Sequence, residues 1–263
     1  MRVLDLFSGI GGFSLGLERV KPFRTVAFCE RDEFCQKVLK KHWPHIPIYE
    51  DVRTIPTDRL GRVDLICGGF PCQPWSVAGQ RRGAEDDRDL WPIMASLVEK
   101  LRPRWVIGEN VRGFINEPLG LKRSLSDLES IGYQATPFVI PACAVDAPHR
   151  RDRVWIIAHT NINSEPNVSI NERARSGELV ADADSSRWQR KWSKRYNEGS
   201  SGLCSGETQR RENFWLSEPP VGRVAHGIPR RMDRLKGLGN AVVPQVVEQI
   251  GKAILTGEVE HDL

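Results

Sequence analysis

The sequence predicts an α/β fold in which helices cover both faces of a mostly parallel, doubly wound sheet, with a small loop-rich insertion. Between residues 2 and 158, short apolar runs alternate with amphipathic stretches of helical period. A glycine-rich turn, Gly9 to Gly12, separates the first run from the first amphipathic stretch, at the edge where open α/β sheets bind ligands. From 161 to about 220 the periodicity stops, and Asn, Ser, Glu, Gly and Arg dominate.

The apolar runs predict the strands and the amphipathic stretches predict the helices. Strands are expected at 2–7, 25–30, 47–52, 63–69, 104–110, 136–140 and 153–160. Helices are expected after the glycine-rich turn and at 32–43, 90–101, near 121–131 and at 242–255. Asp32 is suited to cap the second helix, because its carboxylate can accept hydrogen bonds from backbone N–H groups of the first turn.

Composition narrows the class of protein. The 263 residues are 40% hydrophobic and 27% charged, which is typical of a soluble globular domain. No run approaches the roughly 20 apolar residues of a membrane helix, and the first residues do not resemble a signal peptide. Six cysteines form no CxxC pair and no Cys/His group with zinc spacing. We therefore expect a cytoplasmic monomer without a metal site and without membrane contact.

Positive charge is concentrated in one segment. The chain has 38 basic and 34 acidic residues, a formal net charge of +4. Residues 160–236 hold 14 Lys/Arg against 10 Asp/Glu, so this segment alone carries the whole surplus. Such a segment can be a solvated face, but beside an active site it could also bind phosphates.

The glycine-rich turn favours a nucleoside ligand. Ser14 stands where a dinucleotide-binding fingerprint would have its third glycine after Gly11, so a pyrophosphate is disfavoured. Glu30 ends the second strand, where it can accept hydrogen bonds from ribose hydroxyls. Asp51, just after the third strand, could meet an adenine amino group.

A cysteine follows the fourth strand on a loop with a constrained backbone. Pro71 and Pro74 fix the chain around Cys72, and Gly68 and Gly69 leave the space beside it open. A buried, inert cysteine is the alternative, and we adopt it for the cysteines inside strand or helix patterns, Cys29, Cys35 and Cys67. An exposed cysteine on such a loop can act as a nucleophile when its thiolate is favoured. The polar stretch GQRRGAEDDRD that follows could close as a lid.

Four segments occur in a characteristic order: DLFSGIGGFSLGL, GGFPCQPWS, GEN followed by Val, and GNAVVPQV. Together they resemble the motif series of bacterial and phage DNA cytosine-5 methyltransferases, and the resemblance covers the chain outside roughly 161–225. It implies a Rossmann-like fold that uses S-adenosylmethionine. It also implies a catalytic, S-adenosylmethionine-binding domain made of 1–160 and 237–263, with 161–236 as a short basic target-recognition region.

The resemblance further implies a mechanism. A cytosine flipped out of double-stranded DNA would receive the thiolate of Cys72 at carbon 6 and a methyl group at carbon 5. Glu109 would protonate ring nitrogen 3, and Asn110 would help to position Glu109. Arg153 would contact the cytosine oxygen, and Arg151 the lid and backbone.

Binding residues also follow from the resemblance. The cofactor would contact residues from the strand ends and the C-terminal motif: Phe7, Gly9, Gly11, Glu30, Asp51, Val52, Pro71, Leu90, Asn240 and Val242. DNA would contact residues beside the cysteine and in the basic segment: Gln73, Ser76, Arg187, Arg190, Lys191 and Arg210.

Two other functions fit the same residues. The chain could methylate cytosine in RNA, as one branch of the family does, or it could bind S-adenosylmethionine and DNA as a regulator without turnover. If it is a DNA methyltransferase, a separate restriction endonuclease could be its partner, or it could act alone. About 60 residues remain for sequence recognition, so we expect a short or degenerate target site.

Overall fold

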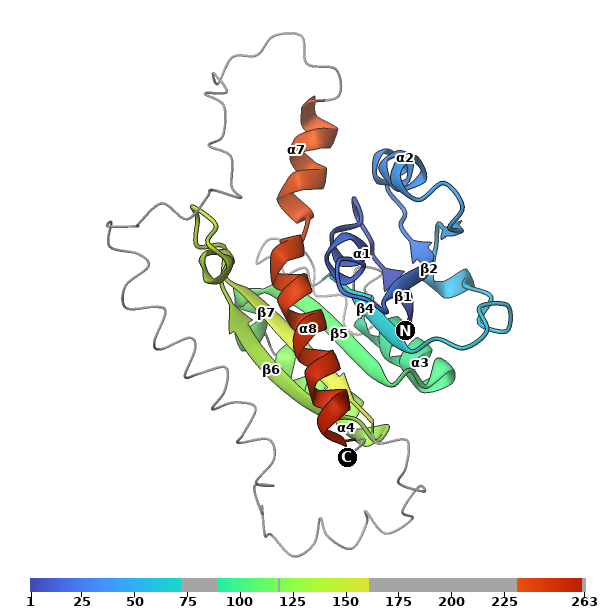
Figure 1. The fold of residues 1–263 in the computed structure, drawn as a ribbon, viewed down its shortest axis with the longest axis vertical. Coiled ribbons are helices and arrows are strands. Elements are labelled where there is room, and N and C mark those ends of the chain that lie inside the picture. Colours follow the sequence, from blue (N-terminus) through green and yellow to red (C-terminus); the bar gives the residue numbers. More distant parts are fainter. Residues whose placement is uncertain (72–88, 118, 161–230, 262–263) are drawn as a thin grey trace, which may run out of the picture.

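The computed structural model describes residues 1–71, 89–117, 119–160 and 231–261 (Figure 1). Seven strands form one sheet in the order β3-β2-β1-β4-β5-β7-β6. They are β1 Arg2–Leu6, β2 Arg24–Cys29, β3 Ile48–Tyr49, β4 Leu65–Gly68, β5 Trp105–Val111, β6 Gln134–Ile140 and β7 Arg153–His159. Every expected strand is present, but β3 is shortened because the chain turns into a 3-10 helix, Val52–Thr54, directly after Asp51.

The helices agree with the amphipathic stretches, with one addition. They are α1 Gly12–Leu17, α2 Glu33–His42, α3 Trp91–Leu101, α4 Leu121–Ser130, α7 Arg231–Asn240 and α8 Pro244–His261. Asp32 caps α2 as expected, since its Oδ1 accepts hydrogen bonds from Phe34 N at 3.0 Å and Cys35 N at 3.2 Å. Helix α7 has no counterpart among the expected helices, and it runs through the predicted domain boundary at residue 237.

The sheet is mostly parallel, with one reversed strand among those described. Strands β3, β2, β1, β4 and β5 pair in parallel, whereas β7 is antiparallel to both β5 and β6. Because β7 runs the other way, its first residue lies beside the last residue of β5, and Arg153 pairs with Val111. The start of β7 therefore joins the carboxyl ends of the parallel strands at one edge of the sheet.

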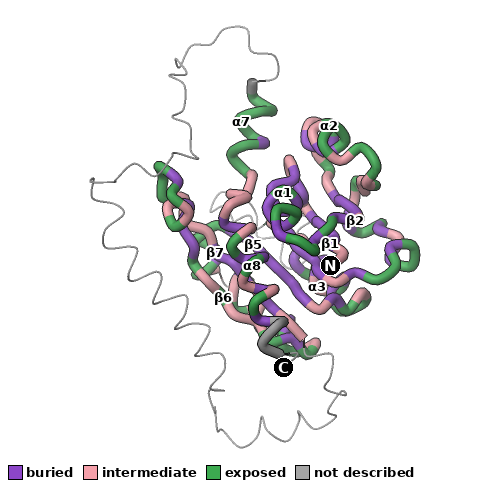
Figure 2. The backbone as a smooth tube through the Cα atoms, in the orientation of Figure 1, coloured by how far each residue is buried: buried purple, intermediate pink, exposed green. Residues whose placement is uncertain are grey.

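Helices cover both faces of the sheet, as expected of a doubly wound fold. One hydrophobic cluster packs α3 and α4 against Leu4, Ile66 and Val106. The other packs α1 and α8 against the opposite face of the same strands, at Leu65 and Ile107. Figure 2 shows the buried residues gathered in the strands, while α7 is largely exposed.

Among the described residues, no helix is both long and apolar enough to cross a membrane.

The cysteines within strand and helix patterns are buried, as expected. They are Cys29, Cys35 and Cys67, and burial raises the pKa of the Cys29 and Cys35 thiols to about 12. These cysteines are therefore protonated near neutral pH and poor nucleophiles.

Candidate active site

The glycine-rich turn adopts a backbone that side chains disfavour. Gly9 and Gly11 have φ angles of 53° and 86°, in the left-handed region that glycine enters without steric cost. A Cβ on Gly11 would lie 2.6 Å from the ring of Trp43, whereas a Cβ on Gly9 would meet no atom within 4 Å. The turn thus packs tightly against α2 at Gly11 and leaves open space over Gly9.

Ser14, the departure from the dinucleotide fingerprint, has a structural role. Its backbone N and its Oγ donate to Oδ2 of Asp5, at 3.2 and 2.7 Å, and Thr25 Oγ1 donates to Ser14 Oγ at 2.8 Å. Asp5 is fully buried at the end of β1, and burial raises its pKa to about 7. This hydrogen-bonded group fixes the start of α1 under the turn.

The acidic residues of the predicted cofactor site lie at neighbouring strand ends. Glu30 follows β2, and its carboxylate accepts hydrogen bonds from Gly9 N and Asp32 N, both at 2.7 Å. Asp51 follows β3 and accepts a hydrogen bond from Arg53 N at 2.9 Å. The structure therefore ties Glu30 to the glycine-rich turn, while each carboxylate oxygen keeps lone pairs for other donors.

The remaining predicted cofactor residues are distributed around this edge. Phe7 is half-buried with a φ of 52°, Val52 is buried, and Leu90 directly precedes α3. Pro71 is exposed at the end of the described segment that follows β4. In the C-terminal segment Asn240 is exposed, whereas Val242 packs on the turn: a Cβ on Gly12 would lie 2.8 Å from its Cγ2.

Several predicted residues lie outside the described part of the chain. They are the predicted nucleophile Cys72 and the predicted DNA contacts Gln73, Ser76, Arg187, Arg190, Lys191 and Arg210. The predicted lid and most of the predicted target-recognition region also fall there. Their assignments stay predictions.

The residue that leads into the cysteine loop is firmly held. The side chain of Phe70 is buried, and its ring packs 4.9 Å from that of Trp91 and 5.4 Å from that of Phe114 between centroids. Its carbonyl accepts a hydrogen bond from Asn110 Nδ2 at 3.0 Å, and Asn110 Oδ1 accepts one from Val111 N at 2.9 Å. Asn110 thus links the end of β5 to the backbone two residues before Cys72.

Glu109 is a buried carboxyl group beside a guanidinium. Its Oε1 lies 2.9 Å from Nε of Arg153, and only 8% of the residue is exposed. Burial raises its pKa to about 7, although Arg153 and Arg151 both favour the charged form. The group can therefore hold a proton near neutral pH, as a general acid must.

The two arginines around Glu109 have different contacts. Arg153 donates through Nη1 to the Asp152 carbonyl at 2.9 Å, in addition to its ion pair with Glu109. Arg151 instead donates through Nη2 to the carbonyls of Gly239 at 2.6 Å and Ala241 at 2.9 Å. The structure thus brings both arginines to the acid, but it directs Arg151 toward the C-terminal segment.

Two contacts of the site were not predicted from the sequence, that of Gly69 with Glu109 and those of Asp152. A Cβ on Gly69 would lie 3.0 Å from Oε2 of Glu109, so a larger residue would crowd the acid. Asp152 pairs with Arg112 at 2.9 Å and with Arg150 at 3.0 Å. The two adjacent glycines before Phe70 could have indicated the close contact with Glu109, whereas nothing in the sequence distinguishes Asp152 from the charged residues around it.

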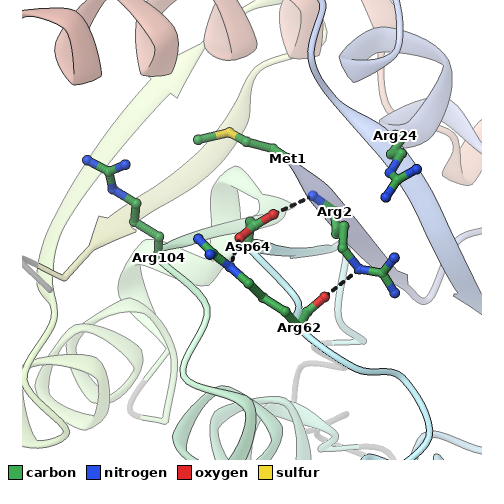
Figure 3. A pocket seen from close by; sticks show the side chains of 6 residues that line it. All are labelled: Met1, Arg2, Arg24, Arg62, Asp64 and Arg104. Carbon is green, nitrogen blue, oxygen red and sulfur yellow. Dashed lines mark hydrogen bonds and ion pairs between the residues drawn. The ribbon is translucent and has the colours of Figure 1, made fainter.

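A cavity of about 390 Å³ lies at the other end of the strands (Figure 3). It is lined by Met1, Arg2, Arg24, Arg62, Asp64 and Arg104. The carboxylate of Asp64 accepts hydrogen bonds from the backbone N of Arg2 at 2.8 Å and from Arg62 Nε at 2.6 Å, so Asp64 and Arg62 form an ion pair within the wall. No group of three His, Cys, Asp or Glu suited to a metal ion occurs among the described residues.

The chain is similar in sequence to several Type II methyltransferases. The Type II methyltransferase M.HgiCII of Herpetosiphon aurantiacus is 35% identical over 185 residues, which is 69% of this chain and 42% of that protein. M.Eco47II of Escherichia coli is 36% identical over 167 residues, 60% of this chain and 39% of that protein. The matched part of this chain thus spans about two fifths of the length of these relatives.

A solved structure and a protein-family model also match this chain. A crystal structure of a Spodoptera frugiperda DNMT2 variant has a TM-score of 0.54 at 22% identity, over 63% of this chain and 51% of that chain, and so has the same Rossmann-like methyltransferase fold. The model of the family described as C-5 cytosine-specific DNA methylase matches residues 1–213. The chain therefore belongs to the C-5 cytosine-specific DNA methylase family.

Proposed function

We propose that this protein transfers a methyl group from S-adenosylmethionine to carbon 5 of a cytosine in double-stranded DNA. The observation that carries the proposal is the geometry around Glu109: a buried carboxyl with a pKa of about 7, paired with Arg153. Asn110, the next residue, is hydrogen-bonded to the backbone that leads to Cys72. An acid, a cation and the path to a thiol thus meet at one edge of the sheet.

The residues at the neighbouring strand ends suit S-adenosylmethionine. The space over Gly9 is open, and the carboxylate of Glu30 stands beside it with lone pairs available for ribose hydroxyls. Asp51 and Val52 would face the adenine, and Leu90, Phe7 and the C-terminal Val242 would supply apolar contacts. When bound, this cofactor would supply a methyl group on a sulfonium, which is electrophilic enough for a carbon nucleophile.

The protein's own groups would perform the remaining chemistry. The Cys72 thiolate adds to carbon 6 of the cytosine, and Glu109 gives its proton to ring nitrogen 3, so that no negative charge accumulates on the ring. Arg153 orients the base through the cytosine oxygen. Bound S-adenosylmethionine would supply the methyl group to carbon 5 and would leave as S-adenosylhomocysteine. A water molecule acting as base would then take the carbon-5 proton, the Cys72 thiolate would leave carbon 6, and ring nitrogen 3 would return its proton to Glu109, which restores the aromatic ring.

We assign DNA binding to the loop that carries Cys72 and to the basic segment 160–236. The cytosine must rotate out of the duplex, which costs a few kcal/mol, and phosphate contacts offset part of that cost. Gln73 and Ser76 would lie near the flipped base, and the basic residues between 187 and 211 near the backbone. We further propose a cytoplasmic monomer, with a separate restriction endonuclease as partner where the protein serves a restriction system.

The test is methyl transfer from radiolabelled S-adenosylmethionine to duplex DNA and, in parallel, to transfer RNA. We expect label in DNA, and bisulfite sequencing of the product would locate the modified cytosines. Duplexes with 5-fluorocytosine at the target position should trap a covalent complex, because fluorine cannot leave as a proton does. Label in RNA alone would favour the RNA methyltransferase, and binding without turnover would favour the regulator.

A matched pair of cysteine variants tests the nucleophile. Cys72→Ser should abolish both transfer and trapping, because a serine hydroxyl forms a far weaker nucleophile than a thiolate at neutral pH. Cys143→Ser, which changes a half-buried cysteine elsewhere, should leave both intact. Full transfer by Cys72→Ser would remove Cys72 from the mechanism.

A further inference from the structure

Arg151 makes an unusual pair of contacts for a residue beside a catalytic acid. Its guanidinium donates to the carbonyls of Gly239 and Ala241, which stand on either side of Asn240. These carbonyls lie at the end of α7, where backbone oxygens lack partners within the helix and the helix dipole is negative. Both hydrogen bonds come from one nitrogen, Nη2, whose two N–H groups and positive charge suit such a pair of acceptors. The backbone of Arg151 has a φ of 38°, which is uncommon for a residue with a side chain.

The segment that Arg151 holds, residues 239–242, is here called the α7–α8 junction. On its other side the junction rests on the glycine-rich turn, because Val242 packs directly against Gly12. Just before it, Gly237 is buried against Ile10, and Lys236 Nζ pairs with Asp32 Oδ2 at 2.8 Å. Figure 1 shows the junction beside α1, between the two C-terminal helices. The junction is thus seated between the cofactor turn and Arg151.

Arg151 also acts electrostatically on the catalytic acid. It lies two residues from Arg153 on the chain, and its charge lowers the pKa of Glu109 against the larger opposing effect of burial. No other described residue both bonds to the junction and acts on Glu109 in this way. One side chain therefore spans the boundary between the proposed cofactor site and the proposed acid.

We propose that Arg151 is a positioning residue that seats the α7–α8 junction on the glycine-rich turn and thereby sets the affinity for S-adenosylmethionine. This role is distinct from the contact with lid and backbone that the family resemblance implies, and it rests on the proposed function. Loss of the guanidinium would leave two carbonyls without a charged donor and release the junction from one side. The wall that carries Asn240 and Val242 would then be less ordered before the cofactor binds.

The test compares Arg151→Met, Arg151→Lys and the neighbouring control Arg150→Met in the full chain. Calorimetry should show S-adenosylmethionine binding about tenfold or more weaker in Arg151→Met, as expected for losing hydrogen bonds to a charged donor. Arg151→Lys keeps the positive charge and several N–H donors, but its ammonium ends one bond short of the position of Nη2, so its loss of affinity should be smaller. At saturating cofactor, the alkaline limb of the kcat profile should move to higher pH in Arg151→Met, because loss of this charge raises the pKa of Glu109. Arg150→Met removes an exposed arginine that pairs with Asp152, and should bind as wild type does.

Hydrogen exchange in Arg151→Lys provides a second test if Arg151→Met fails to fold. Amides of 237–242 should exchange faster in Arg151→Lys than in wild type, and adding S-adenosylmethionine should slow them in both proteins. Unchanged exchange, or unchanged cofactor affinity in Arg151→Met with a large fall in kcat, would overturn the inference and return Arg151 to a contact with base or lid. A wild type that binds no S-adenosylmethionine would instead refute the proposed function.

Discussion

Replacing Arg153 by Gln should raise the pKa of Glu109. In the native protein Oε1 of Glu109 lies 2.9 Å from Arg153 Nε, and Arg153 is the strongest influence that favours the charged carboxylate. Two unit charges about 4 Å apart interact by about 4 kcal/mol at an effective dielectric constant of about 20. Loss of such a neighbour typically moves a carboxyl pKa by about one to three pH units. We therefore expect Glu109 in Arg153→Gln to titrate well above its native value of about 7.

The measurement is the carbon-13 chemical shift of the Glu109 carboxyl across pH 5 to 10 in protein labelled at glutamate Cδ, with the signal assigned through Glu109→Gln. The pH profile of methyl transfer gives an independent view. Because the proposed acid must be protonated, native activity should fall as pH rises through about 7. In Arg153→Gln the residual activity should be lower, but its alkaline limb should move to higher pH.

A second arginine provides the control. Arg112→Gln removes an equal charge that pairs with Asp152 at 2.9 Å, so it should leave the titration of Glu109 nearly unchanged. A Glu109 that titrates in Arg153→Gln at or below its native pKa would refute this account. It would mean that the ion pair contributes little in the folded protein, and that another group sets the protonation of the acid.

Three further outcomes concern stability. Because the pKa of Asp5 is about 7 in the folded protein, its contribution to the free energy of unfolding should be full below pH 4 and should fall by up to about 4 kcal/mol as the pH rises to about 7. Urea unfolding should therefore show a free energy that decreases steeply with pH in the native protein and much less steeply in Asp5→Asn. The same pH dependence in both proteins would contradict this prediction. Asn110→Ala should cost about 1–3 kcal/mol in the same assay by leaving a buried carbonyl without its donor, and a neutral effect would argue against that hydrogen bond. Gly9→Ala should cost about 1–2 kcal/mol for its backbone angle alone, whereas Gly11→Ala should cost more because its Cβ meets Trp43; the reverse order would refute the packing of the turn.

Much of the fold could be predicted from the sequence because the central strands β1, β4 and β5 are buried on both faces. Such strands appear as apolar runs, and the expected runs at 63–69 and 104–110 contain β4 and most of β5. Helix α7 was missed for a physical reason. Its sequence contains two glycines, and its large apolar side chains, Met232, Leu235 and Leu238, are exposed rather than arranged on a buried stripe.

The site was predictable where chemistry is carried by side chains at strand ends. Glu109 and Asn110 were expected together at the end of one strand, and the structure buries both beside Arg153 and Phe70 respectively. The partners of Arg151 could not be predicted in this way. They are backbone carbonyls about 90 residues away. Any residue type can supply a backbone carbonyl, so the sequence gives no sign of which one accepts the hydrogen bond.

Because strand β7 is reversed, the ion pair between Glu109 and Arg153 depends on how β7 is aligned with β5. Glu109 faces Trp155 across the β5–β7 ladder, and Arg153 lies two positions before Trp155, so both charged groups emerge on the same side. An insertion of one residue at position 154 would keep the ladder beyond Trp155 but turn Arg153 to the opposite side. Such a chain would keep its hydrophobic core but lose the ion pair between Arg153 and Glu109. This short stretch of β7 should therefore tolerate exchanges of side chain far better than changes of length.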